Sequence, residues 1–346
     1  MDFSGPSRYV HELSVALTRL GNNVTVFTTK RAHTTTTIQP YEVREVSFIN
    51  LSFFRYPSFA LAIPKEINKN QFDIIHSHAG SGLFSPVLHV ETHYHTPLDY
   101  YALPHYLPAL ISAIRAKKVI AVSEFSKLDL MRYGIPQHNI VVIHLGVDFS
   151  RFNPGVDGTS FRTTLGIGDK KLLLYVGGFN KNKNLVLLLK VMKQLKEMGE
   201  RAFLLMVGKQ DEDEKRLSNL AKELKVSDVV RTAQLSDDIL PNAYAACDLF
   251  VYSSKKEGFG LPILEAVACG RRFVSTPVGI APKLAKMGFG RISSYSTMDF
   301  LSKVIEELNE RPHNPSFQIL KEEFDWVNVA KKTLQVYKMV LNDCDK

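Results

Sequence analysis

The sequence predicts an α/β protein with two domains, each built on a doubly wound parallel sheet. Two observations carry this prediction. The 346 residues exceed what one hydrophobic core usually serves, so about two domains of ordinary size are expected. Short runs of Val, Ile, Leu and Phe alternate with segments of helical period along the chain, and this alternation is typical of parallel strands joined by crossover helices.

In the first half of the chain, a helix is predicted where Tyr9, Leu13 and Leu17 recur at helical spacing, and Gly21 ends it. Residues 34–37 lack a periodic pattern and are expected in a surface loop. Apolar runs predict strands at residues 23–28, 72–76, 87–92, 119–123 and 140–144.

A second series of strands and helices begins at residues 172–176 and includes a helix that Gly199 ends. Residues 146–155 contain Gly and Pro without periodicity, so the domain boundary is placed near Asn153. A final helix is predicted at residues 326–341, with Asp325 as its N-cap, and its apolar face must be buried against another part of the protein. The predicted division is therefore 1–153, 154–325, and a carboxyl-terminal segment 326–346 that packs back on the first domain. Further strands are predicted at residues 203–207, 249–252 and 273–275.

The composition excludes several classes of protein. Hydrophobic residues make up 45% and charged residues 23%, which is typical of a globular protein and not of a disordered one. No apolar run approaches the roughly 18 residues of a membrane-spanning helix. Three cysteines without C-x-x-C spacing predict neither a disulfide framework nor a cysteine metal site. The first six residues lack the features of a secretory signal, so a cytoplasmic location is expected. The net charge of +8 favours an anionic partner: nucleic acid, an acidic membrane surface or a phosphorylated small molecule.

The most informative segment is EGFGLPILEA at residues 257–266, which follows a predicted strand and opens a helix. Gly258 and Gly260 allow a sharp turn, and Pro262 suits a first helical turn because its missing N–H would be unpaired there. The free amides then form a cradle for phosphate. Glu257 and Glu265 flank this cradle and can accept hydrogen bonds from hydroxyls, which suits a sugar nucleotide. The alternative, two acids that merely face solvent or complement the helix dipole, leaves their coincidence with the glycines and the proline unexplained.

This arrangement resembles the retaining, nucleotide-sugar-dependent glycosyltransferases of the GT-B fold, the family 4-like group that includes sucrose synthases and bacterial mannosyltransferases. The segment SGPSRYVHEL at residues 4–13, which contains Gly5, is similar to the family's glycine loop and first helix. VSEFSK at 122–127, HLGVD at 144–148 and FDW near Trp326 also match. The resemblance implies two facing Rossmann-like domains with a cleft between them, the donor bound mainly by the second and the acceptor mainly by the first.

The resemblance also implies roles for individual residues. Glu265 would hold the ribose hydroxyls of the donor and Glu257 would contact the donor sugar. The donor's distal phosphate would bind the loop of Gly258, through the amides of Phe259, Gly260 and Leu261.

A second cradle, GGFNKNKN at residues 177–184, contains Gly177 and Lys183 for the diphosphate. The family usually carries an arginine at one of two positions here, which Gly178 and Asn182 occupy in this chain. Lys181 could supply the missing charge, and a solvated lysine loop is the alternative.

Histidines occur in two pairs, His76 with His78 and His93 with His95. Alternate positions of a strand share a face, so a zinc site is one option, although no carboxylate or cysteine completes the ligand set. By resemblance, His95 reaches the donor sugar, His93 is a second candidate, and a buried core histidine is the alternative. Residues 211–213 form a D-x-D pattern, but acids at the start of a predicted helix complement its dipole, so no metal is implied.

The predicted function is transfer of a sugar from a UDP- or GDP-sugar to a glycan or lipid-linked acceptor, with retention of anomeric configuration. His95, Glu257 and Lys183 are the predicted catalytic residues, and no cofactor is implied. A GT-B epimerase or phosphorylase is the alternative enzyme. A basic nucleic-acid-binding protein is the alternative from another class, and dispersed basic residues speak against it.

Residues 51–64 and 97–108 are aromatic and proline-rich. They are expected to form a wall of the acceptor site or, together with Arg115, Lys117 and Lys118, a patch that contacts the inner membrane surface. Ordinary core helices are the alternative. The sequence leaves open whether the protein forms a homo-oligomer. Finally, the family has a buried strand ahead of its glycine loop, whereas only Met1 to Ser4 precede Gly5. Three explanations stay open: a start downstream of the true one, a sheet closed around the gap, or an edge supplied by another copy.

Overall fold

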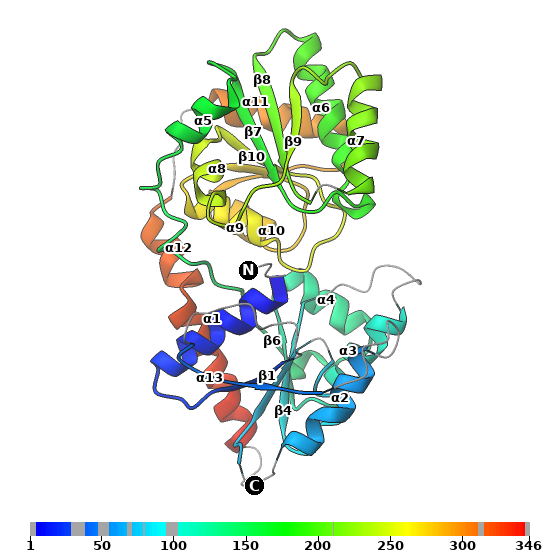
Figure 1. The fold of residues 1–346 in the computed structure, drawn as a ribbon, viewed down its shortest axis with the longest axis vertical. Helices are drawn as coiled ribbons and strands as arrows, with labels where there is room; N and C mark the ends of the chain where they lie inside the picture. The colour runs from blue at the N-terminus through cyan, green and yellow to red at the C-terminus, as the bar shows by residue number, and fades with distance from the viewer. Residues whose placement is uncertain are drawn as a thin grey trace. The chain divides into compact units, whose positions relative to one another are not determined.

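The computed structural model describes residues 5–28, 39–47, 55–67, 71–78, 80–94, 103–209, 211–310 and 315–342 (Figure 1). The chain forms two compact units, each with its own sheets and core. The first contains Met1–Gly146 and Glu323–Lys346, and the second contains Val147–Glu322. The boundary thus falls after Gly146 rather than near Asn153, and the carboxyl-terminal segment groups with the first unit.

The first unit contains two separate parallel sheets. One pairs β1 (Thr25–Thr28) with β2 (Glu42–Glu45). The other has the order β3-β4-β5-β6. Its strands are β3 (Ile75–His78), β4 (His89–His93), β5 (Lys118–Ala121) and β6 (Ile140–Val142). The helices of this unit are α1 (Gly5–Arg19), α2 (Arg55–Glu66), α3 (Leu103–Arg115), α4 (Glu124–Arg132) and α13 (Trp326–Asn342).

Strands form at all five segments predicted for this half, although β3 begins at residue 75 rather than 72. β2 was not predicted, because three of the four residues in its sequence EVRE are charged and it forms no apolar run. The predicted loop at 34–37 lies outside the described residues. Among the described residues, no strand pairing joins the two sheets, so the alternative of one sheet closed around the gap is wrong.

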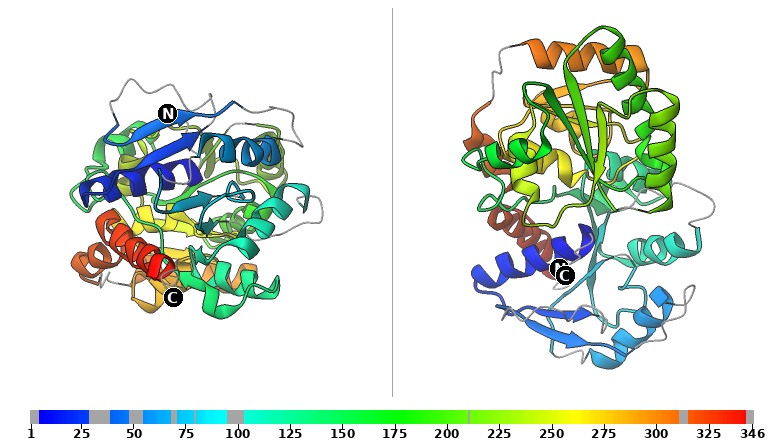
Figure 2. Two further views of the ribbon diagram at one scale, coloured as in Figure 1. Left: turned by 90° about the horizontal axis from the view of Figure 1, so that it is seen from below. Right: turned by 45° about the horizontal axis from the view of Figure 1, so that its top comes forward.

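The helices α1 and α13 lie side by side in both views of the ribbon (Figures 1 and 2) and pack against each other. Tyr9, Leu13 and Leu17 of α1 are buried, and Gly21 ends this segment with a positive φ of 86°. Asp325 caps α13 as predicted, since its Oδ1 accepts from Val327 N at 2.8 Å.

The second unit has one six-stranded parallel sheet in the order β12-β11-β10-β7-β8-β9. Its strand order reverses between β7 and β10, a position where ligands bind in open α/β sheets. The strands are β7 (Lys171–Val176), β8 (Ala202–Val207), β9 (Val230–Ala233), β10 (Leu249–Tyr252), β11 (Phe273–Ser275) and β12 (Gly290–Ile292). The helices are α5 (Thr159–Leu165), α6 (Leu185–Glu197), α7 (Glu212–Glu223), α8 (Leu240–Ala246), α9 (Leu261–Ala268), α10 (Ala281–Lys286), α11 (Thr297–Asn309) and α12 (Phe317–Phe324). The last two residues of α12 are assigned to the first unit.

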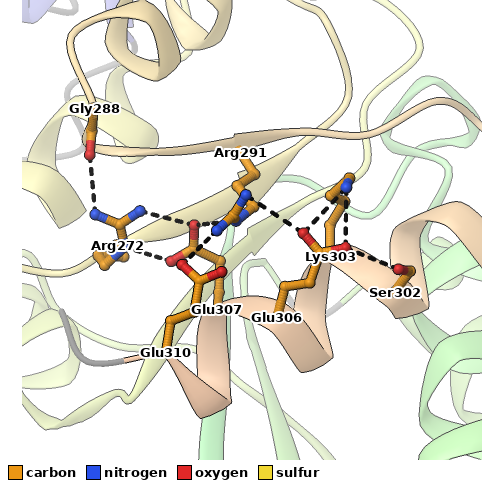
Figure 3. A network of polar contacts seen from close by, with 8 residues as sticks. All are labelled: Arg272, Gly288, Arg291, Ser302, Lys303, Glu306, Glu307 and Glu310. Atoms are coloured by element: carbon orange, nitrogen blue, oxygen red, sulfur yellow. Dashed lines mark hydrogen bonds and ion pairs between the residues drawn. The ribbon is translucent and has the colours of Figure 1, made fainter. Parts of the chain in front are cut away.

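All four strands predicted for this half form, and each of these four is completely buried except for Lys171. Burial on both faces explains their nearly continuous apolar sequences. A network of ion pairs closes the β12 side of the sheet (Figure 3): Glu307 of α11, with 1% of its side chain exposed, pairs with both Arg272 and Arg291. Among the described residues, no helix is both long and apolar enough to cross a bilayer.

Candidate active site

Lys183, Tyr252 and Glu257 form a polar cluster at the carboxyl end of β10 in the second unit. The Lys183 ammonium pairs with Glu257 Oε2. The Tyr252 hydroxyl donates to the same oxygen at 2.8 Å, and Lys183 Nζ lies 3.5 Å from that hydroxyl. The side chains of Lys183 and Glu257 are 18% and 21% exposed, so the pair is accessible to a ligand.

Two hydrogen bonds hold the loops that carry this cluster. Ser253 Oγ donates to the backbone oxygen of Lys183 at 2.8 Å, and Lys255 N donates to that of Asn182 at the same distance. Because β7 and β10 are neighbours in the sheet, the loops that follow them meet at its carboxyl edge. Residues far apart in the sequence are thereby joined in one site.

The loop after β7 is shaped by Gly177 and its neighbours. Gly177 has a φ of 155°, and a Cβ at this position would lie 2.6 Å from the Tyr175 hydroxyl. That hydroxyl donates to Gly178 O at 2.7 Å, while Gly177 N donates to Val207 O at 2.9 Å. Within the described ranges, no side chain caps the helix α6 that follows. Its first amides are therefore available to an anion.

The loop after β10 leads into α9 through Gly260, which has a φ of 88° and occupies the N-cap position. No described side chain caps α9, so Leu261 N at its first residue is open to a ligand, whereas Pro262 has no N–H and Ile263 N donates to Gly260 O at 3.0 Å. Phe259 is buried, and its backbone oxygen accepts from Ile280 N at 2.7 Å. Gly279 allows this close approach, since a Cβ there would lie 2.0 Å from the same oxygen. The hydrogen bond from Ile280 to Phe259 therefore holds this loop in place.

Glu265 lies inside α9 with 4% of its surface exposed. Its Oε2 accepts from the Tyr244 hydroxyl at 2.8 Å. Burial, followed by the charge of Glu265, raises the pKa of Tyr244 well above its ordinary value, so the tyrosine keeps its proton and stays a donor. The carboxylate is oriented before any ligand binds.

Sequence reasoning missed the three tyrosines of this site. The rings of Tyr175 and Tyr252 stack with centroids 5.6 Å apart, and burial together with Glu257 raises the pKa of both hydroxyls well above the usual value. Tyr252 is the last residue of β10, and Tyr175 is the last but one of β7. A polar aromatic residue at that end of a buried strand was the available signal.

Comparison with known proteins identifies the family. The profile described as "Glycosyl transferases group 1" matches residues 159–323, and that described as "Glycosyltransferase Family 4" matches residues 3–151. The chain belongs to this glycosyltransferase family.

Curated relatives agree with this assignment. An uncharacterised glycosyltransferase of Methanocaldococcus jannaschii is 27% identical over 67% of this chain and 62% of its own length. A D-inositol 3-phosphate glycosyltransferase of Catenulispora acidiphila is 29% identical over 66% of this chain and 57% of its own length. These matches span less than two thirds of either relative.

Solved structures confirm the predicted GT-B fold. Sucrose-phosphate synthase from Thermosynechococcus elongatus superposes with a TM-score of 0.83 at 22% identity, covering 98% of this chain and 94% of that one. HepE from Anabaena, solved in complex with UDP and glucose, gives 0.79 at 19% identity, with 97% and 96% covered.

The histidines of β3 belong to a buried network of hydrogen bonds and ring contacts. His76 Nδ1 lies 2.6 Å from the Tyr337 hydroxyl, and its Nε2 lies 2.6 Å from Thr92 Oγ1. His78 stacks on His76 with centroids 4.5 Å apart, which confirms that the two share a face. Burial lowers the pKa of His76 well below its ordinary value and that of His78 to about 3, so both are neutral.

Three further predictions have separate outcomes. His93 is buried in β4, whereas His95 lies outside the described residues. Gly5 is the first residue of α1. Asp211 caps α7 by accepting from the amides of residues 213 and 214, which confirms that the acids of the D-x-D pattern complement a helix start. Within the described part of the chain, no three His, Cys, Asp or Glu side chains are grouped as metal ligands would be.

Proposed function

We propose that this protein transfers a sugar from a nucleoside-diphosphate sugar to an acceptor with retention of anomeric configuration. The observation that carries the proposal is the pairing of Lys183 with Glu257 between the uncapped starts of α6 and α9. A cation and the unbonded first amides of two helices at one sheet edge suit a diphosphate. The named HepE complexes with UDP and with UDP-glucose support a nucleotide-sugar donor.

The donor would be held by residues in distinct roles. Glu265 would accept hydrogen bonds from the ribose hydroxyls, and Glu257 would contact the donor sugar. Lys183, with the amides of the two loops, would bind the diphosphate. Since Lys183 pairs with Glu257 in the ligand-free site, the diphosphate would compete with that carboxylate for the ammonium. Binding of the donor would thereby free Glu257 to accept from the sugar.

The chemical step exchanges one bond at the anomeric carbon. The acceptor oxygen forms a bond to C1 on the face from which the C1–O bond to the diphosphate breaks. The acceptor proton passes to the leaving phosphate oxygen, so the products are the glycoside and the free nucleoside diphosphate. Negative charge grows on the diphosphate in the transition state, where Lys183 and the loop amides stabilise it. His95 is proposed to contact the transferring sugar.

The proposal is tested in two stages. A thermal-shift screen of nucleoside diphosphates and their UDP- and GDP-sugars identifies the donor, because a ligand of the folded state raises the melting temperature. Release of nucleoside diphosphate is then measured with glycan and lipid-linked acceptors, and proton NMR gives the anomeric configuration of the product. An inverted product would refute retention. Conversion of the donor sugar without any acceptor would favour an epimerase, and a mobility shift of nucleic acid without donor binding would favour the non-catalytic alternative.

A second proposal concerns the first unit, where α3 exposes an apolar stripe beside basic residues. Leu107, Ile111 and Ile114 follow one another at helical spacing and are 46%, 37% and 61% exposed. Arg115 and Lys117 are exposed at the end of this helix. An apolar stripe with cations at its end suits the surface of an anionic membrane, and a lipid-linked acceptor would be reached there. Flotation of the protein with anionic vesicles at low salt tests this contact.

A further inference from the structure

Tyr252 contacts both members of the pair formed by Lys183 and Glu257. Its hydroxyl donates to Glu257 Oε2 at 2.8 Å and lies 3.5 Å from Lys183 Nζ. The same ammonium lies 5.8 Å from the centre of the tyrosine ring. Only 1% of Tyr252 is exposed. A buried tyrosine hydroxyl needs a partner inside the protein, so its bond to Glu257 persists as long as the carboxylate stays within reach.

The ring of Tyr252 is held more firmly than the side chain of Lys183. It belongs to β10, whose four residues are all buried, and it stacks on Tyr175 and Phe250 with centroids 5.6 and 6.0 Å apart. Lys183 instead ends a short 3₁₀ helix, and 18% of its side chain is exposed. Its ammonium is carried by a flexible four-carbon chain, so it can move toward the charge of a ligand. Lys183 is therefore the partner that can leave Glu257, and Tyr252 is the partner that stays.

The two carboxylate oxygens of Glu257 have different surroundings. Both the Lys183 ammonium and the Tyr252 hydroxyl bond to Oε2. In the described part of the chain, no residue donates a hydrogen bond to Oε1. An ionised carboxylate accepts through both oxygens, so Oε1 can accept from a ligand hydroxyl while Oε2 stays bound to the protein. This division of the two oxygens suits a carboxylate that must meet a sugar in one fixed orientation.

The Tyr252 hydroxyl remains a donor over the ordinary pH range. Burial, followed by the charge of Glu257, raises the pKa of Tyr252 well above its ordinary value. The tyrosine therefore keeps its proton, and an ionised carboxylate can only accept. The hydrogen bond runs from Tyr252 to Glu257 whether or not Lys183 is close by.

We propose that Tyr252 is a positioning residue for the transfer reaction, which holds Glu257 toward the donor sugar after the diphosphate has drawn Lys183 away. This inference rests on the proposed function, since that function assigns Glu257 to the sugar and Lys183 to the diphosphate. Without the tyrosine hydroxyl, no described residue would hold the carboxylate during transfer. A displacement of about 1 Å at a group that contacts the reacting sugar can lower a rate by about 10²-fold.

The test is Tyr252→Phe, which keeps both ring stacks and removes only the hydroxyl. Release of nucleoside diphosphate at saturating donor should fall by about tenfold or more, whereas the dissociation constant of plain nucleoside diphosphate should stay within about twofold. Tyr295→Phe is the matched control, because that hydroxyl donates to Lys255 O at 3.0 Å in the same loop and does not bond to Glu257. Its turnover should stay within about twofold of the unaltered protein. An equal fall in both variants would assign the effect to a loosened loop and overturn the proposal.

A double-mutant cycle with Glu257→Ala shows whether Tyr252 acts through the carboxylate. Rates are measured with enzyme in excess over donor, so that slow variants are resolved. Adding Tyr252→Phe to Glu257→Ala should lower the rate by less than about twofold, because the positioned group is already gone. A fall of about tenfold in that background would show a role independent of Glu257 and overturn the proposal.

The unaltered protein separates this inference from the function on which it rests. Normal turnover in both the unaltered protein and Tyr252→Phe would overturn the positioning role and leave the transfer reaction in place. Absence of turnover in the unaltered protein with every donor that binds would refute the proposed function, and the role of Tyr252 with it.

Discussion

The ammonium of Lys183 and the carboxylate of Glu257 are paired in the second unit although 74 positions separate them in the sequence. Each residue lies in a different loop at the carboxyl edge of the sheet, and Tyr252 donates a hydrogen bond to the same carboxylate. The ammonium of Lys183 is proposed to bind the diphosphate. Before the donor binds, the carboxylate of Glu257 neutralises this ammonium. Replacing either member of the pair should affect catalysis in a different way.

Lys183→Ala should lower turnover by about 10² to 10³-fold, because the leaving diphosphate loses a charge that stabilises it. Lys190→Ala, an exposed lysine on α6, is the control and should retain full turnover. Both rates are measured as release of nucleoside diphosphate at saturating donor. A Lys183→Ala protein with normal turnover would remove this lysine from the site.

Glu257→Gln and His95→Ala should depress turnover while leaving the affinity for plain nucleoside diphosphate little changed. Both side chains are assigned to the transferring sugar, which the nucleoside diphosphate lacks. Calorimetric titration with nucleoside diphosphate and steady-state rates with the whole donor separate the two effects. Loss of nucleoside diphosphate binding in a folded variant would contradict the assignment of that residue.

Glu265→Ala should weaken donor binding by about 1.5 to 3 kcal/mol, since the ribose hydroxyls would lose a charged acceptor. Tyr244→Phe is the matched variant: it removes the hydrogen bond to Glu265 and keeps the carboxylate. Its effect on the donor dissociation constant should be smaller, because only the orientation of Glu265 changes. Equal affinities of Glu265→Ala and the unaltered protein would refute the ribose role.

The sequence predicted the parts of this site that depend on local chemistry. Gly260 occupies the left-handed N-cap position that only a glycine adopts easily, and a loop with Gly and Pro before a helix indicated this turn. Tyr252 lies at the carboxyl end of a buried strand, which was an available signal, whereas Tyr244 could not be predicted, because its partner Glu265 comes from another helix. A tyrosine in a buried helix has the same sequence pattern whether or not its hydroxyl meets a glutamate.

The same distinction applies to the fold. Buried strands such as β7 and β8 were predictable from their apolar runs, whereas β2 was missed because three of its four residues are charged. The gap between β1 and β3 depends on pairing between segments distant in the chain.

Glu307→Ala should destabilise the second unit by about 3 kcal/mol, because Arg272 and Arg291 would lose a buried partner. Glu306→Ala on the same helix is the control: its carboxylate is 34% exposed, so its loss should destabilise the unit much less than the loss of Glu307. Urea unfolding followed by circular dichroism gives both values. Similar midpoints for the two variants would show that the network in Figure 3 contributes little.

Ile111→Ser combined with Ile114→Ser should abolish flotation with anionic vesicles if α3 contacts the membrane surface. Both side chains are exposed, so the fold should tolerate the change. Ile319→Ser, at a side chain 52% exposed in the second unit, is the control and should float like the unaltered protein. Flotation of the double variant at the original level would exclude this stripe as the contact.

The stability of the first unit should fall as the pH rises from about 4.5 to 7, and Glu91 is the expected cause. This glutamate is fully buried in β4, and burial raises its pKa to about 7, although Ser77, Gly80 and Ser112 all donate hydrogen bonds to it. The folded state therefore holds a proton that the unfolded state releases near its ordinary pKa of 4.5. Stability from this group is fully present below pH 4.5 and is lost as the pH rises through 7.

The measurement is urea unfolding followed by Trp326 fluorescence, which reports the first unit, at pH 5, 6, 7 and 8. At about 1.4 kcal/mol per pH unit over this range, the unaltered protein should lose roughly 3 kcal/mol between pH 4.5 and 7 and then level off. Glu91→Gln keeps the shape and an acceptor for Gly80 N but cannot ionise, so its curve should lack this fall. Both proteins share every other titrating group, including the neutral His76 and His78, so the difference between their curves isolates Glu91. Parallel curves would show that the carboxyl group does not titrate in this interval.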